Sequence, residues 1–268
     1  MKLVAMVRAP AKPEEAASSL GNALGLTLAE ARMRLAPEPP TVLALLAPAP
    51  ADALVSKLRG AGMAVLSVDA AVPSDSERTV ARTVALGPTG ATFQPRSGAP
   101  VELPWGEVVA ILRGVSAVRT EMSSVQESKK FSLATAIATQ GLKTSQTVEK
   151  TVRSHQEQVE QVILVYGRGG QRISLREQGI DYSCLGAAMQ PTRTANIAVL
   201  ARLLKEKTPG AFHDERLIRL GRRPLPMFIG GEVRTSRPSQ TSVETAGGLD
   251  VLAEILWRAV EQGLLSPT

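Results

Sequence analysis

The first 70 residues contain three short apolar runs separated by stretches with mixed apolar and polar positions. The runs Lys2–Val7, Thr41–Leu46 and Met63–Val68 have the length and composition of β-strands. The stretches between them are longer and carry helix start and stop signals. The pattern therefore predicts a compact α/β unit over 1–70 with the order β-α-α-β-α-β.

The helix signals divide the intervening stretches into three helices. Pro13 and the two glutamates after it suit the first turn of a helix, where proline fits and acidic side chains meet the positive end of the dipole. Thr27 followed by Glu30 forms a capping box, which predicts the start of a second helix. A third helix begins near Pro50 and ends at Gly60.

Two segments of this unit resemble a known family. Residues 24–32 (LGLTLAEAR) and 53–65 (ALVSKLRGAGMAV) resemble the C-terminal domain of the bacterial ribosomal stalk protein and the related Clp-protease adaptor fold. In the stalk family a short helix pair presents basic residues to translation factors, and Arg32 matches one of those basic positions. The helix at 13–24 (PEEAASSLGNAL) is acidic and small where the family is lysine-rich. The resemblance therefore implies the fold and a docking surface that includes Arg32. It implies a domain that binds a partner without catalysing a reaction, and it does not extend to the ribosomal role.

Residues 71–77 are small and polar and are expected to form a linker. Apolar runs typical of strands resume over 78–118, and Trp105 stands in their middle. A lone tryptophan in such a region usually fills the core, so we expect Trp105 to anchor the sheet. The alternative is that Trp105 forms part of a partner-binding surface.

Residues 120–158 change character, because Ser, Thr, Gln and Lys dominate there. We expect a polar insertion that is mobile or weakly helical, with 131–141 as its one apolar island. Strand patterns return at 159–176, where a glycine run at 167–170 indicates a hairpin turn. A phosphate loop is not supported, because no helix or Lys-Ser/Thr end follows the run. The strand pattern is expected to continue through 177–185.

The helix Thr192–Lys207 has a threonine cap, an apolar face and lysines in its last turn. Antiparallel strands closed by one amphipathic helix are similar to small bacterial pleckstrin-homology-like (PH-like) domains, so we assign 78–220 to a mostly antiparallel PH-like β-domain. Residues 221–247 are expected to form an Arg/Pro/Gly loop. Residues 248–264 are expected to form a last helix, either part of the core or free to dock. The expected fold class is α+β.

The composition limits the possible cellular locations of the protein and the kinds of partner that it could bind. The single cysteine, Cys184, excludes an internal disulfide and favours a reducing, cytoplasmic location. No apolar run is long enough for a transmembrane helix, and the first residues are expected to form a strand and not a signal peptide. Aromatic residues make up only 3%, so aliphatic side chains must build the core. The net charge of +6 favours acidic partners, namely nucleic acid, anionic lipid or acidic protein surfaces.

Candidate chemistry is sparse. None of the standard hydrolase, peptidase, dinucleotide or phosphate-loop motifs occurs, and we expect no catalytic, cofactor or metal site. The histidines are His155, in the polar stretch, and His213, which is followed by Asp214 and Glu215. An enzyme of unfamiliar type using these last three residues is the least favoured hypothesis. Cys184 is expected to be an inert core thiol.

Two non-enzymatic functions remain. The favoured one is a cytoplasmic adaptor or regulatory protein that binds a protein partner through its small domains. The alternative is association with nucleic acid or anionic lipid through the basic stretch 216–237, although this stretch has only one stacking aromatic. The candidate anion contacts in this stretch are Arg216, Arg219, Arg222, Arg223, Arg234 and Arg237.

Overall fold

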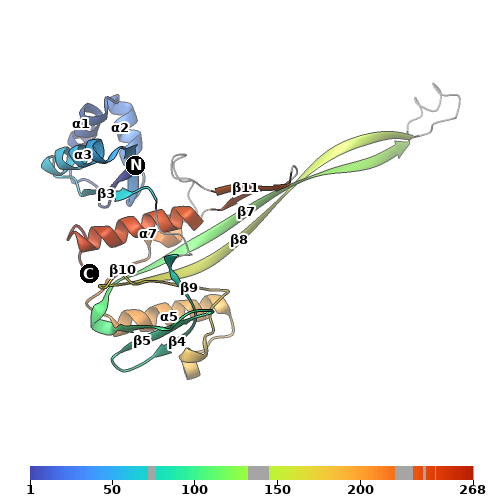
Figure 1. Ribbon diagram of the computed structural model, residues 1–268. Helices are drawn as coiled ribbons and strands as arrows, with labels where there is room; N and C mark the ends of the chain where they lie inside the picture. Colours follow the sequence, from blue (N-terminus) through green and yellow to red (C-terminus); the bar gives the residue numbers. More distant parts are fainter. Residues whose placement is uncertain (72–76, 132–144, 221–231, 238–239, 245, 268) are drawn as a thin grey trace.

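The protein is an α+β chain with a small antiparallel sheet and a larger mixed sheet, as expected (Figure 1). The computed structural model describes residues 1–71, 77–131, 145–220, 232–237, 240–244 and 246–267.

The N-terminal domain has the expected order of elements. They are β1 (Lys2–Met6), α1 (Pro13–Leu24), α2 (Leu28–Leu35), β2 (Thr41–Leu46), α3 (Pro48–Gly60) and β3 (Val65–Asp69). Its three strands pair antiparallel in the order β2-β1-β3. The three helices cover one face of this sheet, where Val4, Leu20 and Leu58 lie in a shared aliphatic core. The predicted capping box is confirmed. The Thr27 side chain accepts a hydrogen bond from the Glu30 backbone amide, and the Glu30 carboxylate accepts one from the Thr27 backbone amide.

The β-domain contains two three-stranded meanders. They consist of β4 (Thr79–Leu86), β5 (Gly90–Pro95) and β6 (Val101–Pro104), then β7 (Val108–Phe131), β8 (Ser145–Gly167) and β9 (Arg172–Arg176). A short 3-10 turn, η2 (Trp105–Glu107), connects them. Parallel pairing of Thr79 with Ile173 and of Val80 with Ser174 joins the two meanders into one sheet. The glycine run forms the predicted hairpin turn, in which the Gly167 amide donates to the Gln171 carbonyl at 3.0 Å.

The remaining elements cover or extend this sheet. They are η3 (Ser183–Ala188), α5 (Arg193–Lys207), β10 (Phe212–Asp214), α6 (Arg216–Leu220), β11 (Glu232–Arg237), β12 (Gln240–Glu244) and α7 (Ala246–Glu261). Helix α5 is the predicted closing helix, and the Thr192 side chain caps it by accepting the Ala195 amide at 3.2 Å. Ile197, Leu200 and Leu204 of α5 are buried against the β-domain strands.

The prediction for 120–158 is wrong where the structure describes it. Residues 120–131 and 145–158 belong to β7 and β8, which pair in continuous antiparallel register as far as Phe131 and Ser145. Both strands are polar along both faces in this part. The apolar alternation that marks a half-buried strand is therefore missing from the sequence. Residues 132–144, with most of the apolar island, lie outside the described residues.

Two further stretches differ from expectation. The segment 221–247 is not a single loop, because β11 and β12 form a hairpin within it and β12 pairs with β7. Residues 177–185 do not continue the strand pattern: the Gly179 amide donates to the Arg176 carbonyl, and η3 begins at Ser183. The buried side chains Ile180 and Tyr182 therefore belong to a turn that packs on the sheet. Their apolar alternation in the sequence resembles that of a strand because both side chains are buried.

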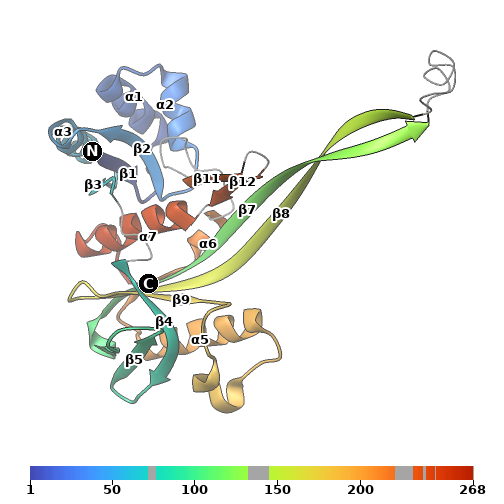
Figure 2. The same cartoon turned by 45° about the vertical axis from the view of Figure 1, so that its right-hand side comes forward.

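Helix α7 lies between the two sheets (Figure 2). Leu3 and Leu66 approach it from the small sheet, and Leu112 and Leu164 from the large one. Its residues from Leu249 to Trp257, apart from Asp250, are buried on every side of the helix. A helix that is apolar nearly all round is typical of a central layer. The last helix is therefore core, and it covers both domains at once.

Candidate binding groove beside Trp105

An open groove of about 800 Å³ lies where η2, the end of α5 and the end of α7 meet. These three segments are far apart in the sequence, and only the fold brings them together. Its lining residues are Trp105, Gly106, Val108, Val109, Arg168, Lys207, Thr208, Pro209, Gly210, Ala211, Val260, Glu261 and Pro267.

Trp105 is held in a fixed position at this groove. Its Nε1–H donates to the Gly87 carbonyl at 3.2 Å, and its backbone amide donates to the Thr89 carbonyl at 3.0 Å. The half-buried indole packs against the core of the β-domain, so the prediction that Trp105 anchors the sheet is confirmed. The same residue also lines the groove. It thus presents an aromatic surface that pays little entropy on binding, because the ring is already ordered.

The far wall of the groove is the turn after α5, in which Thr208 and Ala211 are buried and Pro209 and Gly210 are exposed. The Thr208 hydroxyl donates to the Leu204 carbonyl at 2.7 Å and ends the helix. His213 Nε2 lies 2.9 Å from the Thr208 carbonyl oxygen. Because a carbonyl oxygen can only accept, Nε2 carries a proton and donates it here. The imidazole therefore locks the turn that shapes this wall.

The rim of the groove carries more positive than negative charge. Lys207 is exposed in the last turn of α5. Arg168 is 70% exposed and lies 3.4 Å from the Glu107 carboxylate, an exposed pair of little strength. The one carboxylate among the lining residues, Glu261, accepts from Arg258 at 2.7 Å and is thereby partly neutralised.

The histidine cluster of the enzyme hypothesis does not converge. His213 bonds to the Thr208 turn, while Asp214 Oδ2 accepts from Arg216 Nε at 2.7 Å. Glu215 Oε1 accepts from Arg113 at 2.8 Å. Three neighbouring residues thus turn to three different partners. Within the described ranges, no group of three His, Cys, Asp or Glu side chains is arranged to hold a metal ion. His155 lies in the part of β8, residues 145–158, whose side chains are outside the described part.

Arg32 and Trp105 are not brought together. Arg32 lies on α2, in the helical layer of the N-terminal domain, on the opposite side of its sheet from α7 (Figure 1). Its Nε donates to Glu14 of α1 at 3.1 Å, and both side chains stay more than half exposed. The charge of Arg32 is therefore partly neutralised by a neighbouring carboxylate. A partner that binds this surface would contact an ion pair and not an isolated positive charge.

Two of the six candidate anion-contact arginines bind within the chain. Arg216 donates to Asp214 and, through Nη1, to the Pro39 carbonyl at 3.1 Å. Arg219 donates to Glu38 at 2.6 Å. Both side chains thus connect α6 to the N-terminal domain. Arg222 and Arg223 lie outside the described residues, and Arg234 and Arg237 are described only by their backbone in β11.

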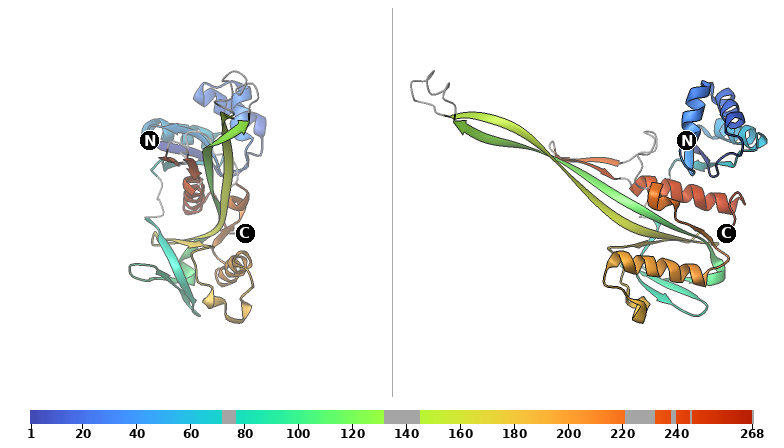
Figure 3. Two further views of the ribbon diagram at one scale, coloured as in Figure 1. Left: turned by 90° about the vertical axis from the view of Figure 1, so that its right-hand side faces the viewer. Right: turned by 180° about the vertical axis from the view of Figure 1, so that it is seen from behind.

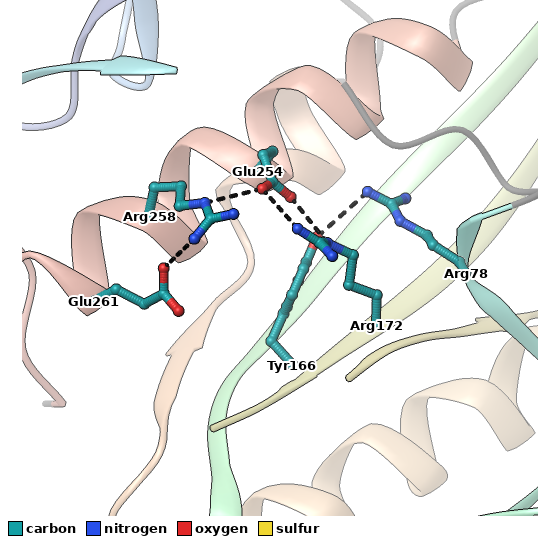
Figure 4. A network of polar contacts seen from close by, with 6 residues as sticks. All are labelled: Arg78, Tyr166, Arg172, Glu254, Arg258 and Glu261. Atoms are coloured by element: carbon teal, nitrogen blue, oxygen red, sulfur yellow. Dashed lines mark hydrogen bonds and ion pairs between the residues drawn. The ribbon is translucent and has the colours of Figure 1, made fainter. Parts of the chain in front are cut away.

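A polar cluster that the sequence did not reveal holds α7 against the large sheet (Figure 4). Glu254, which is 5% exposed, accepts from Arg172 at 3.2 Å and from Arg258 at 3.1 Å. The two guanidinium carbons lie 4.5 and 4.2 Å from the centroid of the buried Trp257 ring, within range of a cation–π interaction.

Tyr166 and Arg78 extend this cluster into the interior. The Tyr166 ring stacks on Trp257 with centroids 5.1 Å apart. Burial raises the pKa of the Tyr166 hydroxyl far above its ordinary value, so it stays protonated. Arg78 is almost fully buried and pairs with Asp250 of α7. With each charge matched, the cluster is suited to fixing one arrangement of helix and sheet and not to proton transfer.

Cys184 is a half-buried residue of η3, and burial raises the pKa of its thiol. The thiolate is the reactive form of cysteine, so this shift makes Cys184 a poor nucleophile at neutral pH.

Comparison with protein-family models, with curated proteins and with solved structures finds no match to this chain. The likenesses to the stalk protein and to PH-like domains therefore remain predictions. In the part of the chain that the structure describes, no helix combines the length and apolar character needed to cross a bilayer.

Proposed function

We propose that the protein is a non-enzymatic adaptor or regulatory protein of the cytoplasm that binds a segment of a partner protein in the groove beside Trp105. The observation that carries this proposal is the groove itself. Its volume of about 800 Å³ combines a fixed indole with a positively charged rim.

The size and lining of the groove support binding of a protein segment. Specific binding pockets typically span about 300–1,000 Å³ and combine apolar walls with a few polar groups. Here Trp105, Val109 and Val260 supply apolar wall, and the turn at 208–211 supplies a rigid border. Tryptophan and arginine are the residue types that most often dominate binding energy at protein interfaces.

The charges of the rim favour a particular occupant. Lys207 and Arg168 stand on the rim, where Arg168 shares its charge with Glu107 and the Glu261 carboxylate is bonded to Arg258. Charge complementarity therefore favours a partner segment with an apolar anchor for Trp105 and carboxylates on either side of it. The occupant that we propose is such an acidic, apolar-anchored peptide segment.

Two further observations support a role without catalysis. His213, Asp214 and Glu215 each bond to a different neighbour, so they form no acid–base pair. Burial raises the pKa of Cys184 and weakens it as a nucleophile. A single cysteine in 268 residues is also consistent with a reducing compartment.

The test uses the full chain and two fluorescent peptides with the same leucine–phenylalanine anchor. One peptide has glutamates on both sides of the anchor and the other has lysines. We expect the glutamate peptide to bind at least roughly tenfold more tightly, and Lys207→Glu to weaken it by a similar factor. Lys205→Glu is the matched control, because Lys205 lies on the same exposed helix end but does not line the groove.

Equal binding of the two peptides, or equal loss in Lys207→Glu and Lys205→Glu, would refute the groove as the binding site. If the peptides behave as expected, cross-linking in cell lysate identifies the natural partner. Only a protein captured by the wild type and the Lys205→Glu control, and lost with Lys207→Glu, counts as that partner.

A further inference from the structure

The β7–β8 ribbon extends away from the body of the molecule (Figure 3). Strand β12 pairs with β7 as far as Met122, and β11 pairs with β12. From the Ser123–Arg153 pair to the Phe131–Ser145 pair, the described sheet consists of β7 and β8 alone. At about 3.4 Å per residue, this two-stranded part is about 30 Å long.

The register determines which positions share a face of this sheet. Residues directly opposite in antiparallel strands lie on the same face, and the face alternates along each strand. Thr120 is opposite Gln156 on one side and Ser242 on the other, and Ser242 is opposite Arg234. One row across four strands therefore places Arg234 on the face of the even-numbered positions of β7.

The same face continues outward in steps of two residues. In the next row Met122 is opposite Gln240, which is opposite Arg237. Further out, Gln126 is opposite Lys150. Near the end of the ribbon, Lys130 is opposite Gln146. We call this surface the basic face, and its four cationic positions are Arg234, Arg237, Lys150 and Lys130.

From the Arg119 row outward, the carboxylates of the ribbon belong to the opposite face. Glu121, Glu127, Glu149 and Glu157 all occupy odd-numbered rows of β7 or positions opposite them. Between the Thr120 and Lys130 rows the basic face has no carboxylate and otherwise consists of Ser, Thr, Gln, Val and Met. Carboxylates return at the Val118 row, where Glu244 and Glu232 pair. The opposite face is of mixed charge, since Lys129 and Arg153 share it with these carboxylates, whereas the basic face carries only cations between the Thr120 and Lys130 rows.

We propose that the basic face binds duplex DNA, with the two-stranded part of the ribbon in the major groove. The major groove is about 12 Å wide and admits a two-stranded β-ribbon. Lysine and arginine neutralise phosphates, and a face without carboxylates avoids repulsion from them. Serine, threonine and glutamine can hydrogen-bond to phosphates and to base edges. This inference goes beyond the groove beside Trp105 and does not rest on it.

The test is fluorescence anisotropy of the full chain with a labelled duplex of about 20 base pairs, over a range of salt concentrations. Binding is expected to weaken with salt, with a slope near −3 to −4 in log K against log salt for about four phosphate contacts. Lys130→Glu with Lys150→Glu should weaken binding at least roughly tenfold and lower the slope by about two.

The control reverses two charges on the opposite face of the same ribbon, Lys129→Glu with Arg153→Glu. Its net charge is identical to that of the first double variant, so a difference between them reports the face and not the overall charge. We expect the control to change affinity less than roughly threefold. Lys130→Gln with Lys150→Gln provides a milder version, and circular dichroism checks that each variant is folded.

Equal loss in the two charge-reversed variants, or no binding at low salt, would overturn the proposal. Binding to vesicles of phosphatidylcholine and phosphatidylserine without binding to DNA would also overturn it, in favour of a lipid surface. Duplex RNA has a deep, narrow major groove, so equal affinity for it would contradict the groove placement. Lys207→Glu should keep full DNA affinity. The DNA-binding proposal can therefore be tested independently of the proposal that the Trp105 groove binds a peptide.

Discussion

The Leu249 side chain of α7 occupies the space beside Gly114 of β7 that any larger residue would need. A Cβ built on Gly114 would lie 2.3 Å from Leu249 Cδ1 and 3.1 Å from the Leu217 Cβ of α6. Glycine in a strand often marks a place where another element approaches the backbone closely. The close packing of Leu249 and Leu217 on β7 therefore uses the space left by the absent side chain of Gly114.

Replacing Gly114 with alanine is expected to destabilise the fold by about 1–3 kcal/mol, because the new methyl group must displace the buried end of the Leu249 side chain and lies close to the Leu217 Cβ. Urea unfolding measures the change. Gly60→Ala, at the end of α3, is the control, since a Cβ there meets nothing within 4 Å. Equal midpoints for Gly114→Ala and the wild type would show that α7 does not need this close approach.

Glu254→Gln is expected to lower the free energy of unfolding by about 2 kcal/mol, because the change leaves two guanidinium groups without their buried carboxylate. Loss of an enclosed ion pair usually costs more, but Arg258 is 40% exposed and water partly replaces the contact. Glu206→Gln removes an exposed pair with Arg202 and should change stability by less than about 0.5 kcal/mol. If the loss of unfolding free energy is no larger than in this control, the cluster does not stabilise the position of α7.

The capping box at α2 predicts a pH dependence. The Thr27 hydroxyl and amide each donate to Glu30 Oε2 at 2.8 Å, which lowers the Glu30 pKa below its ordinary value of 4.5. A lowered folded-state pKa stabilises the fold above the unfolded value, and the effect is lost as the pH falls through the folded pKa. Glu30→Gln should therefore destabilise the protein at pH 7 and have little effect well below pH 4.5.

Thermal unfolding at several pH values measures this effect. In a Thr27→Ala background the same Glu30→Gln substitution should cost less at every pH above 4.5, because the hydroxyl donor is gone. A stability difference that does not change with pH would contradict the capping box as its source.

Arg216 offers a test of how α6 is tied to the N-terminal domain. Its guanidinium reaches Asp214 and the carbonyls of Pro39 and Val7 together. Lysine has a single nitrogen and cannot span these acceptors, so Arg216→Lys should cost about 1 kcal/mol. Arg219→Lys is the matched control, because its one contact with Glu38 lies on a side chain that is 67% exposed. Hydrogen exchange at β1 should accelerate in Arg216→Lys and stay unchanged in Arg219→Lys.

Elements with buried apolar residues in a regular local pattern could be predicted from the sequence. The helices after Thr27 and Thr192 each combine a local start signal with an apolar face, and the strands of the N-terminal domain are short, almost wholly apolar runs. In these places local chemistry and burial favour the same structure.

The ribbon could not be predicted, because its pairing comes from backbone hydrogen bonds along strands that are polar on both faces. A pattern of apolar alternation is absent where no face is buried. The central place of α7 was detectable in principle, since Val251, Ala253 and Trp257 add apolar positions outside a single stripe. Only part of the groove could be predicted from the sequence. Trp105 could be selected as a candidate binding residue, but no local sequence signal connects it with Lys207 or Val260.

The position of α7 has a consequence for how the chain folds as it is made. Both sheets are complete in sequence before α7 begins at Ala246, yet their facing apolar surfaces need this helix as cover. Arg8 donates to the Leu264 carbonyl at 2.8 Å across 256 positions of chain. During synthesis the first domain therefore leaves the ribosome with one face of its sheet bare, and contacts of such high sequence separation form slowly. Until α7 emerges, that apolar face is exposed and prone to aggregation.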